Sequence, residues 1–269
     1  MKFSENATEK EVLEYISHLN NDASVDGILT QLPLPEHMDE TLITSSISYK
    51  KDVDGVHPLN MAAMARHEDP KFIPCTPKGV MELIKSVCPD IKGKKATVIG
   101  RSNIVGMPIS LLLQKEFATV TLCHAFTENL KDEVSTADIV VSATGSPHLI
   151  KGDFVKPGAV VIDVGTRYIK DPNSPKGRRL VGDIEYESVS KKPVYLTPVP
   201  GGVGPMTITM LMDNIVKAWK DNLNLDESAS LNDTSRIQND SQKMGEQAHF
   251  NLESIQNRPS LTGKNSSMF

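Results

Sequence analysis

The chain has 269 residues, of which 39% are hydrophobic and 23% are charged, and its formal net charge at pH 7 is −5. This length and composition suit one or two globular domains. A weakly acidic chain without a Lys/Arg-rich block is a poor ligand for nucleic acid or an anionic membrane surface, so neither is expected as a partner. No apolar run reaches about 18 residues, the length that a membrane-spanning helix needs.

The cysteines and the first residues bear on the compartment. Cys75, Cys88 and Cys123 stand far apart, without the spacing of a metal site or a disulfide framework. The first residues show neither the apolar core of a signal peptide nor the Arg-rich character of a transit peptide. We therefore expect a cytoplasmic or mitochondrial location, with the cytoplasm favoured, and no metal ligands.

The first part of the chain predicts two helices separated by a strand. Residues 8–20 should form a helix, because Thr8 and Glu11 have the capping-box spacing before apolar residues at the helical period. Residues 25–31 read as a β-strand that a proline-rich segment ends. A second helix is expected over residues 39–48.

From residue 75 onwards the pattern alternates between helices and strands. Thr76 before Pro77 predicts a capped helix that runs to about residue 87. Short apolar runs predict buried parallel strands with helices between them. The expected strands are residues 96–99, 120–123, 139–143 and 160–164, and the expected helices are residues 105–115 and 206–219. Such alternation is typical of a doubly wound, parallel-sheet α/β domain of the Rossmann type.

Glycines follow two of these strands. The strand at residues 96–99 ends at Gly100, and Gly106 opens the next helix, which lets backbone approach a pyrophosphate at the positive end of that helix. Gly145 follows the strand at residues 139–143, and ligands of such sheets bind outside the carboxyl ends of the strands. The spacing is not G-x-G-x-x-G, so a tight turn without a ligand stays open as an alternative.

The end of the second strand bears on the choice of dinucleotide. His124 and Ala125 follow it, and no acid stands there to hold the ribose hydroxyls of NAD. Arg101 has a guanidinium group that suits a 2′-phosphate. NADP is therefore favoured, NAD remains possible, and a merely solvated Arg101 is the alternative.

Two further segments suit a flat heterocycle. The carboxylate of Asp54, beside Gly55, can pair with an N–C–N edge that offers two parallel donors, although a simple turn explains it too. Residues 197–207 hold three glycines and three prolines, which make a rigid wall poor in side chains. A structural connector is the alternative interpretation of this wall.

Together these segments resemble the bifunctional methylenetetrahydrofolate dehydrogenase/cyclohydrolase family. The matching segments occur in family order and are residues 26–35, 51–55, 74–79, 100–102, 156–165, 181–183 and 200–207. The resemblance implies oxidation of 5,10-methylenetetrahydrofolate to 5,10-methenyltetrahydrofolate with NAD(P)⁺, followed by hydrolysis to 10-formyltetrahydrofolate. It also implies tetrahydrofolate derivatives as ligands and a homodimer.

The resemblance assigns roles to residues at matching positions. Gln31 and Asp54 are implied to be catalytic: Asp54 would hold the pterin edge, and Gln31 would hydrogen-bond a catalytic lysine. The substrate would contact these two residues and also Thr30, Leu32, Pro200, Gly201, Gly202, Val203 and Gly204. The cofactor would contact Thr76, Gly100, Arg101, Ser102, His124, Ala125, Thr166 and Thr207.

The resemblance also implies a division of the chain. Residues 1–75 would form an incomplete α/β folate-binding domain, completed by a helix at residues 205–220, and residues 76–204 the NAD(P)-binding Rossmann domain. Residues 221–269 are rich in Asn, Ser, Gln and charge, and we expect them to form a disordered tail. We expect a planar pteridine and a dinucleotide to meet in a trench between Asp54 and Arg101.

The sequence departs from the family pattern in three places. The family has a Tyr-x-x-x-Lys motif whose lysine transfers protons in the hydrolysis, and these 269 residues contain no such motif. Ala125 stands where many NADP-using members have Ser, and Thr166-Arg167 replaces the usual Ile-Asn. We therefore expect a chain truncated at its N-terminal end, with impaired cyclohydrolase activity. The alternatives are a non-catalytic, NADP-binding isoform that pairs with a full-length subunit, and an unrelated NAD(P) dehydrogenase built on the same sheet.

Overall fold

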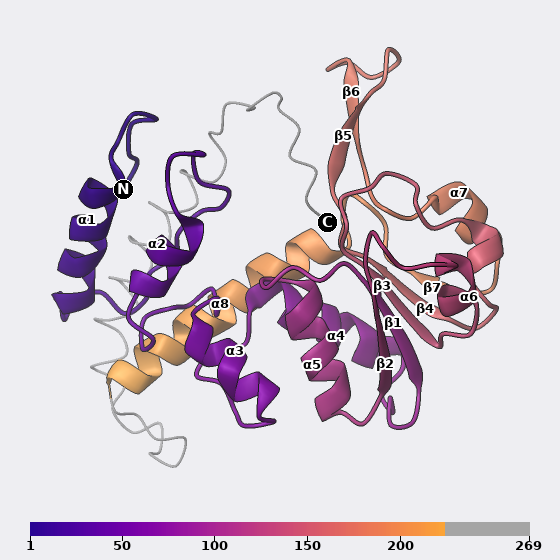
Figure 1. Cartoon of the computed structure of the whole chain (residues 1–269), viewed down its shortest axis with the longest axis horizontal. Coiled ribbons are helices and arrows are strands. Elements are labelled where there is room, and N and C mark those ends of the chain that lie inside the picture. Colours follow the sequence, from indigo (N-terminus) through magenta and orange to yellow (C-terminus); the bar gives the residue numbers. More distant parts are fainter. Residues whose placement is uncertain (224–269) are drawn as a thin grey trace, which may run out of the picture. The chain divides into compact units, whose positions relative to one another are not determined.

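The computed structural model describes residues 1–223 (Figure 1). Residues 1–219 form one compact unit. The expected disordered tail lies outside the described residues from residue 224 onwards, and its first residues, Asp221 and Asn222, belong instead to the last helix, α8 (Val203–Asn222). None of the described helices is both long and apolar enough to cross a membrane.

A five-stranded parallel sheet forms the centre of the unit, in the strand order β2-β1-β3-β4-β7. Its strands are β1 (Lys95–Ile99), β2 (Thr119–Cys123), β3 (Ile139–Ser142), β4 (Val160–Asp163) and β7 (Tyr195–Leu196). In the register, Ile99 pairs with Cys123 on one side and with Ser142 on the other. Strands β3 and β4 are buried at every position, as expected for parallel strands covered on both faces.

Helices cover both faces of this sheet (Figure 1). Helices α4 (Cys75–Val87) and α5 (Gly106–Lys115) pack with Val98, Val141 and Ile162 in one core. The other core joins Val140 and Val161 to α6 (Leu130–Ser135), the 3₁₀ helix η1 (Gly152–Phe154) and α7 (Tyr186–Val189). The doubly wound α/β fold predicted from the sequence is confirmed.

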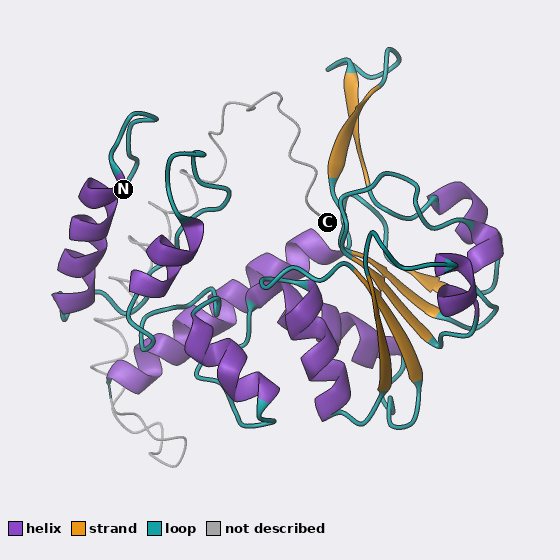
Figure 2. Ribbon diagram, viewed as in Figure 1, coloured by secondary structure: helices purple, strands orange, loops and turns teal. Residues whose placement is uncertain are grey.

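A two-stranded antiparallel hairpin stands apart from the main sheet (Figure 2). It consists of β5 (Arg167–Lys170) and β6 (Arg178–Val181), with Arg167 paired to Val181. The sequence analysis did not predict this hairpin, nor the short helix α3 (Pro58–Ala65).

The amino-terminal region contains two helices around a small core. Helix α1 (Glu9–Asn21) begins with the expected capping box: Glu11 N–H donates to Thr8 Oγ1 at 3.2 Å, and Thr8 N–H donates to the Glu11 carboxylate at 2.7 Å. Helix α2 (Glu40–Ser46) is capped by Asp39. The buried residues of this core include Val12, Ile16, Ile28, Ile43 and Ile47.

The strand predicted at residues 25–31 is wrong. Only a single parallel bridge forms there, between Ile28 and Asp52, with Ile28 N–H donating to Lys51 O at 2.7 Å. Parallel pairing is weaker per residue than antiparallel pairing, and two strands without further neighbours are marginal. The segment therefore contributes one buried side chain, Ile28, and no ladder.

The predicted cap of helix α4 is also wrong. The residue that precedes the helix is Pro74, which makes no side-chain cap hydrogen bond, and Thr76 lies within the first turn. Its hydroxyl oxygen lies 3.0 Å from that of Thr207 on α8. Thr76 therefore joins two helices rather than closing the end of one.

Candidate active site

In the turn between β1 and α5, Gly100 and Gly106 leave the backbone without side chains, and we call this turn the cradle. Gly100 has φ +107°, and a Cβ there would overlap backbone atoms of Ala143. A Cβ at Gly106, the first residue of α5, would overlap the carbonyl of Gly100. Strand order reverses between β1 and β3, so this turn lies at the switch point where doubly wound sheets bind ligands. The geometry fits a dinucleotide phosphate, because backbone N–H groups at the start of a helix can approach it closely.

The polar residues predicted to bind the cofactor lie in this turn and directly after the neighbouring strand, β2. Arg101 and Ser102 are exposed, and the Ser102 hydroxyl accepts Gly106 N–H at 3.4 Å. Gly100 N–H donates to Cys123 O at 2.9 Å, so Arg101 lies at the same sheet edge as the β2 end. That end carries His124 and Ala125, both exposed.

Two other predicted cofactor residues come from distant parts of the chain. Thr76 and Thr207 lie in hydroxyl contact although they are 131 positions apart in the sequence. Thr166 is exposed at the carboxyl end of β4, where its neighbour Arg167 donates from Nη1 to Gly145 O at 3.5 Å. Gly145 and Thr166 are thus at the same edge of the sheet as Gly100.

Two buried acids fix this edge, and the sequence analysis did not single them out. The Asp183 carboxylate accepts Ser142 Oγ–H at 2.9 Å and Thr144 N–H at 2.7 Å. The Asp163 carboxylate accepts the N–H groups of Asp183 and Ile184, both at 2.9 Å. Burial raises the pKa of Asp163 to about 6, against the lowering effect of these backbone donors. The two acids therefore tie the ends of β3 and β4 to the hairpin.

In the sequence, the feature that could have indicated these acids is a pair of glycines, Gly165 and Gly182. A Cβ at Gly165 would overlap the Asp183 carboxylate, and a Cβ at Gly182 would overlap that of Asp163. Each acid thus occupies the space left by a glycine that lies within two residues of the other acid in the sequence. Both acids are buried, and the hydrogen bonds that they accept come from backbone N–H groups and the Ser142 hydroxyl.

Asp54, which was predicted to bind the pterin, lies in a loop after the buried Asp52. The Asp52 carboxylate accepts His57 N–H at 2.8 Å and Asn60 Nδ2–H at 3.0 Å, which orders the loop. Burial raises the pKa of Asp54 to about 6, a hydrogen bond from Cys75 lowers it, and the charge of Asp52 raises it. Burial and the Asp54 charge raise the pKa of the Cys75 thiol, so Cys75 stays a neutral donor.

The residues predicted to surround Asp54 lie in loops. Gln31 is exposed and donates from Nε2 to Leu32 O at 3.0 Å, while Thr30 and Leu32 are half-buried. These contacts do not test the predicted catalytic role of Gln31, which stays a prediction.

The predicted wall at residues 200–204 is a turn that runs into a helix. Gly201 has φ +110°, and Gly202 N–H donates to Pro198 O at 2.9 Å. Val203 is buried and begins α8, so the helix starts earlier than residue 205. Pro200, Gly201 and Gly204 are exposed.

A hollow of about 550 Å³ lies beside this turn. Its lining includes Pro200, His148, Asp163 and Arg179, from the wall, the sheet edge and the hairpin. Neither Asp54 nor Arg101 lines it, so the trench expected between those two side chains is not this hollow.

Comparison with known proteins identifies the family of this chain. The model of the tetrahydrofolate dehydrogenase/cyclohydrolase NAD(P)-binding domain matches residues 74–223, and that of the catalytic domain matches residues 1–54. The chain is 53% identical over 221 residues to the bifunctional protein FolD 4, chloroplastic, of Arabidopsis thaliana, covering 82% of this chain but only 61% of that protein. It is 53% identical over 216 residues to the bifunctional protein FolD of Acetivibrio thermocellus, covering 80% of this chain and 73% of that protein.

A solved structure agrees. The crystal structure of Trypanosoma brucei N5,N10-methylenetetrahydrofolate dehydrogenase-cyclohydrolase, complexed with NADP cofactor and inhibitor, contains a chain that is 41% identical in sequence to this one. It superposes with a TM-score of 0.77 and covers 81% of this chain and 75% of that chain. The resemblance noted from the sequence is confirmed: the chain belongs to the tetrahydrofolate dehydrogenase/cyclohydrolase family, and residues 74–223 match its NAD(P)-binding domain.

Proposed function

We propose that the protein is an NAD(P)-dependent dehydrogenase that oxidises 5,10-methylenetetrahydrofolate to 5,10-methenyltetrahydrofolate. The observation that carries this proposal is the bare cradle at Gly100 and Gly106, at the switch point of a sheet that matches the family's NAD(P)-binding domain. The bound NAD(P)⁺ supplies the hydride acceptor of this reaction.

The cofactor would be held at the carboxyl edge of the sheet. The backbone at Gly100 and the side chains of Arg101 and Ser102 would hold phosphates, while His124, Ala125, Thr76, Thr207 and Thr166 would complete the contacts. We favour NADP over NAD, because residues 124–127 contain no acid for the ribose hydroxyls and the exposed Arg101 suits a 2′-phosphate. Ala125 contributes no hydroxyl to that phosphate.

The folate would be held by Asp54 and the loops around it. A carboxylate offers two acceptors to the N–C–N edge of a pterin, and the half-buried position of Asp54 strengthens such hydrogen bonds. Thr30, Gln31 and Leu32 would line the same site, with the wall at residues 200–204 against the flat face of the ring. Gln31 would hydrogen-bond a catalytic lysine.

The hydrolysis to 10-formyltetrahydrofolate is the weaker half of the proposal. In the family the lysine of a Tyr-x-x-x-Lys motif transfers the proton, and these 269 residues hold no such motif. Loss of a general acid/base typically lowers a rate by about 10²- to 10⁴-fold. We therefore propose that a protein of these residues alone is impaired as a cyclohydrolase.

Two further properties are proposed. A homodimer is proposed on the family resemblance. A cytoplasmic or mitochondrial location is supported by the free thiols of Cys75, Cys88 and Cys123, which suit a reducing compartment.

The purified chain should be tested with 5,10-methylenetetrahydrofolate and each dinucleotide, following reduction of the cofactor by its absorbance. Reduction of NADP⁺ well above a buffer control would support the proposal. Binding of NADP by calorimetry without any reduction would favour the non-catalytic isoform. Absence of both binding and reduction would reject the proposed function.

A further inference from the structure

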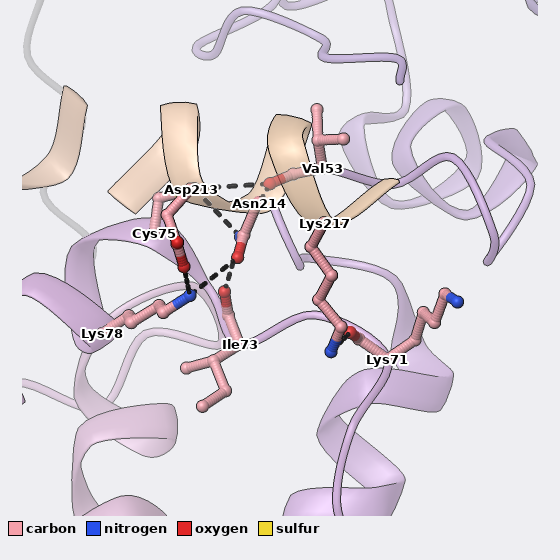
Figure 3. Close-up of polar contacts among 8 residues, drawn as sticks. All are labelled: Val53, Lys71, Ile73, Cys75, Lys78, Asp213, Asn214 and Lys217. Carbon is pink, nitrogen blue, oxygen red and sulfur yellow. Dashed lines mark hydrogen bonds and ion pairs between the residues drawn. The ribbon is translucent and has the colours of Figure 1, made fainter. Parts of the chain in front are cut away.

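The amide of Asn214 on α8 lies at the centre of a group of polar contacts (Figure 3). Asn214 is 1% exposed, and its Nδ2 donates to Val53 O at 2.9 Å and to Ile73 O at 3.0 Å. Its Oδ1 accepts Lys78 Nζ–H at 3.1 Å. Both N–H groups and the oxygen of the amide therefore have hydrogen-bond partners.

The charged neighbours fix the orientation of this amide. Lys78 on α4 also forms an ion pair with Asp213, so its ammonium group is held beside Asn214 Oδ1 (Figure 3). A cation next to the oxygen and two carbonyls next to the nitrogen permit one amide orientation and disfavour the flipped one.

Both accepting carbonyls belong to segments that meet at Asp54. Val53 precedes it directly, and Cys75 N–H donates to Asp54 O at 3.2 Å. The Cys75 sulfur lies 3.4 Å from Val53 O and 3.5 Å from Asn214 Nδ2. Gly55, with φ +74°, has no Cβ and so leaves room for the backbone of residues 73–74. The loop that carries Asp54 is thus packed onto residues 73–75 and fastened to α8 by one buried amide.

We propose that Asn214 is a positioning residue for substrate binding: its amide holds the backbone before Asp54 against α4 and α8, so that the Asp54 carboxylate meets the pterin edge at a fixed place. This inference rests on the function proposed above. Loss of the amide donors would leave the partly buried Ile73 O without its hydrogen bond and Val53 O with the Cys75 thiol alone, which drives the loop to rearrange.

Rearrangement of the loop would change the pKa of Asp54, whereas a general loss of stability would not. The titratable groups that act on Asp54 are Asp52 in its own loop and Cys75 on α4, and Lys78 acts in turn on Cys75. Burial is the main cause of the raised pKa of Asp54. If the loop opens to water, the pKa of Asp54 falls towards that of an ordinary aspartate. The pH at which substrate binding is lost should then fall with it.

The test is the affinity for 5-formyltetrahydrofolate, measured by calorimetry between pH 5 and 8 for the wild-type chain and for Asn214→Asp. This variant keeps the shape of the side chain and an oxygen for Lys78, but it turns a carboxylate oxygen towards two carbonyls. We expect about a tenfold or greater weakening at neutral pH. The pH midpoint of binding should move below the wild-type value of about 6 in the uncharged variant Asn214→Ser, because a new carboxylate at residue 214 would itself raise the pKa of Asp54. The NADP affinity should be unchanged in both variants.

Lys217→Ala is the matched control. Lys217 is also on α8 and donates from Nζ at 2.7 Å to a backbone carbonyl, Lys71 O, which lies outside the loop that carries Asp54 (Figure 3). This variant should keep both the affinity and the midpoint. Asn214→Ser, which retains one donor and adds no charge, should show a smaller loss of folate affinity and serves if Asn214→Asp does not fold.

The outcomes separate the two proposals. If the wild-type chain does not bind 5-formyltetrahydrofolate, the proposed function fails and the inference falls with it. If the wild-type chain binds and the folded Asn214 variants bind equally well with the same midpoint, only the positioning role is overturned. A parallel loss of folate and NADP affinity with an unchanged midpoint would also overturn it, because that result indicates a purely structural role.

Discussion

The two regions matched by the family models differ in how their binding residues are held. In residues 74–223, β1 pairs with a strand on each side, and the cradle at Gly100 follows from that sheet. In residues 1–54, the only parallel pairing found in the described structure is the bridge between Ile28 and Asp52. Instead, Cys75 N–H donates to Asp54 O and Asn214 Nδ2 donates to Val53 O, and both donors belong to the other region. The proposed cofactor site is therefore built by its own sheet, whereas the proposed folate site depends on α4 and α8, which lie within the residues matched by the NAD(P)-binding domain model.

The largest effect is expected where the sheet alone builds the site. In Gly106→Ala the new Cβ would overlap the Gly100 carbonyl, and neither α5 nor the turn can move without disturbing the buried sheet. The displaced backbone would lose more than one hydrogen bond to a charged phosphate, each worth about 1.5–3 kcal/mol, so we expect NADP affinity to fall by about 100-fold or more, as measured by calorimetry. Gly204→Ala, where a Cβ meets open space, is the control and should leave NADP affinity unchanged. Equal affinity in wild type and Gly106→Ala would show that the cradle does not contact the cofactor.

On the folate side, Asp54→Asn removes the charge but keeps the shape. Hydrogen bonds to charged groups contribute about 1.5–3 kcal/mol, so we expect 5-formyltetrahydrofolate affinity to fall by roughly 10- to 100-fold. NADP affinity should not change, since Asp54 and Arg101 belong to different elements. Retention of full folate affinity would remove Asp54 from the proposed site.

The wild-type chain should show the same dependence through pH. The folded pKa of Asp54 is raised to about 6, so the carboxylate is present above that pH and is lost as the pH falls through it. Folate affinity should therefore drop below about pH 6, whereas NADP affinity should not follow that midpoint. A flat folate profile from pH 5 to 8 would contradict the assignment of Asp54 as the pterin-binding acid.

The smallest effect concerns the choice of dinucleotide. Arg101 is exposed, so water screens its contact with a phosphate. We expect Arg101→Ala to weaken NADP binding by about tenfold and NAD binding hardly at all. Measuring both dissociation constants checks the ratio, and a parallel loss of both would place Arg101 at the pyrophosphate rather than at the 2′-phosphate.

Elements with a strong local pattern were predicted well. Helix α1 follows from its capping box, and β3 and β4 follow from short runs of β-branched residues. Residues 25–31 have a similar apolar run, but a strand also needs partners, which a local pattern does not report. The hairpin β5–β6 was missed because β5 is mostly exposed and both strands are rich in charge, so no apolar alternation marks them.

The glycines between β1 and α5 were easier to recognise in the sequence than the residues that hold the loop of Asp54. Gly100 and Gly106 are visible because glycine marks a backbone that must come close to something. Asn214 is a single polar residue in a helix, and its acceptor at Val53 lies 161 positions away in the sequence. Only the fold brings such residues together, and no feature of the sequence near Asn214 indicates its contact with Val53.

The central claim is that the folate-binding acid is held in place from α8. A double-mutant cycle of Asp54→Asn and Asn214→Asp, read as 5-formyltetrahydrofolate affinity at neutral pH, tests it most directly. If Asn214 acts through Asp54, Asn214→Asp should weaken binding in the wild-type background and have little further effect once Asp54 is replaced. Fully additive losses would contradict this account, because they would show that Asn214 and Asp54 affect the ligand independently.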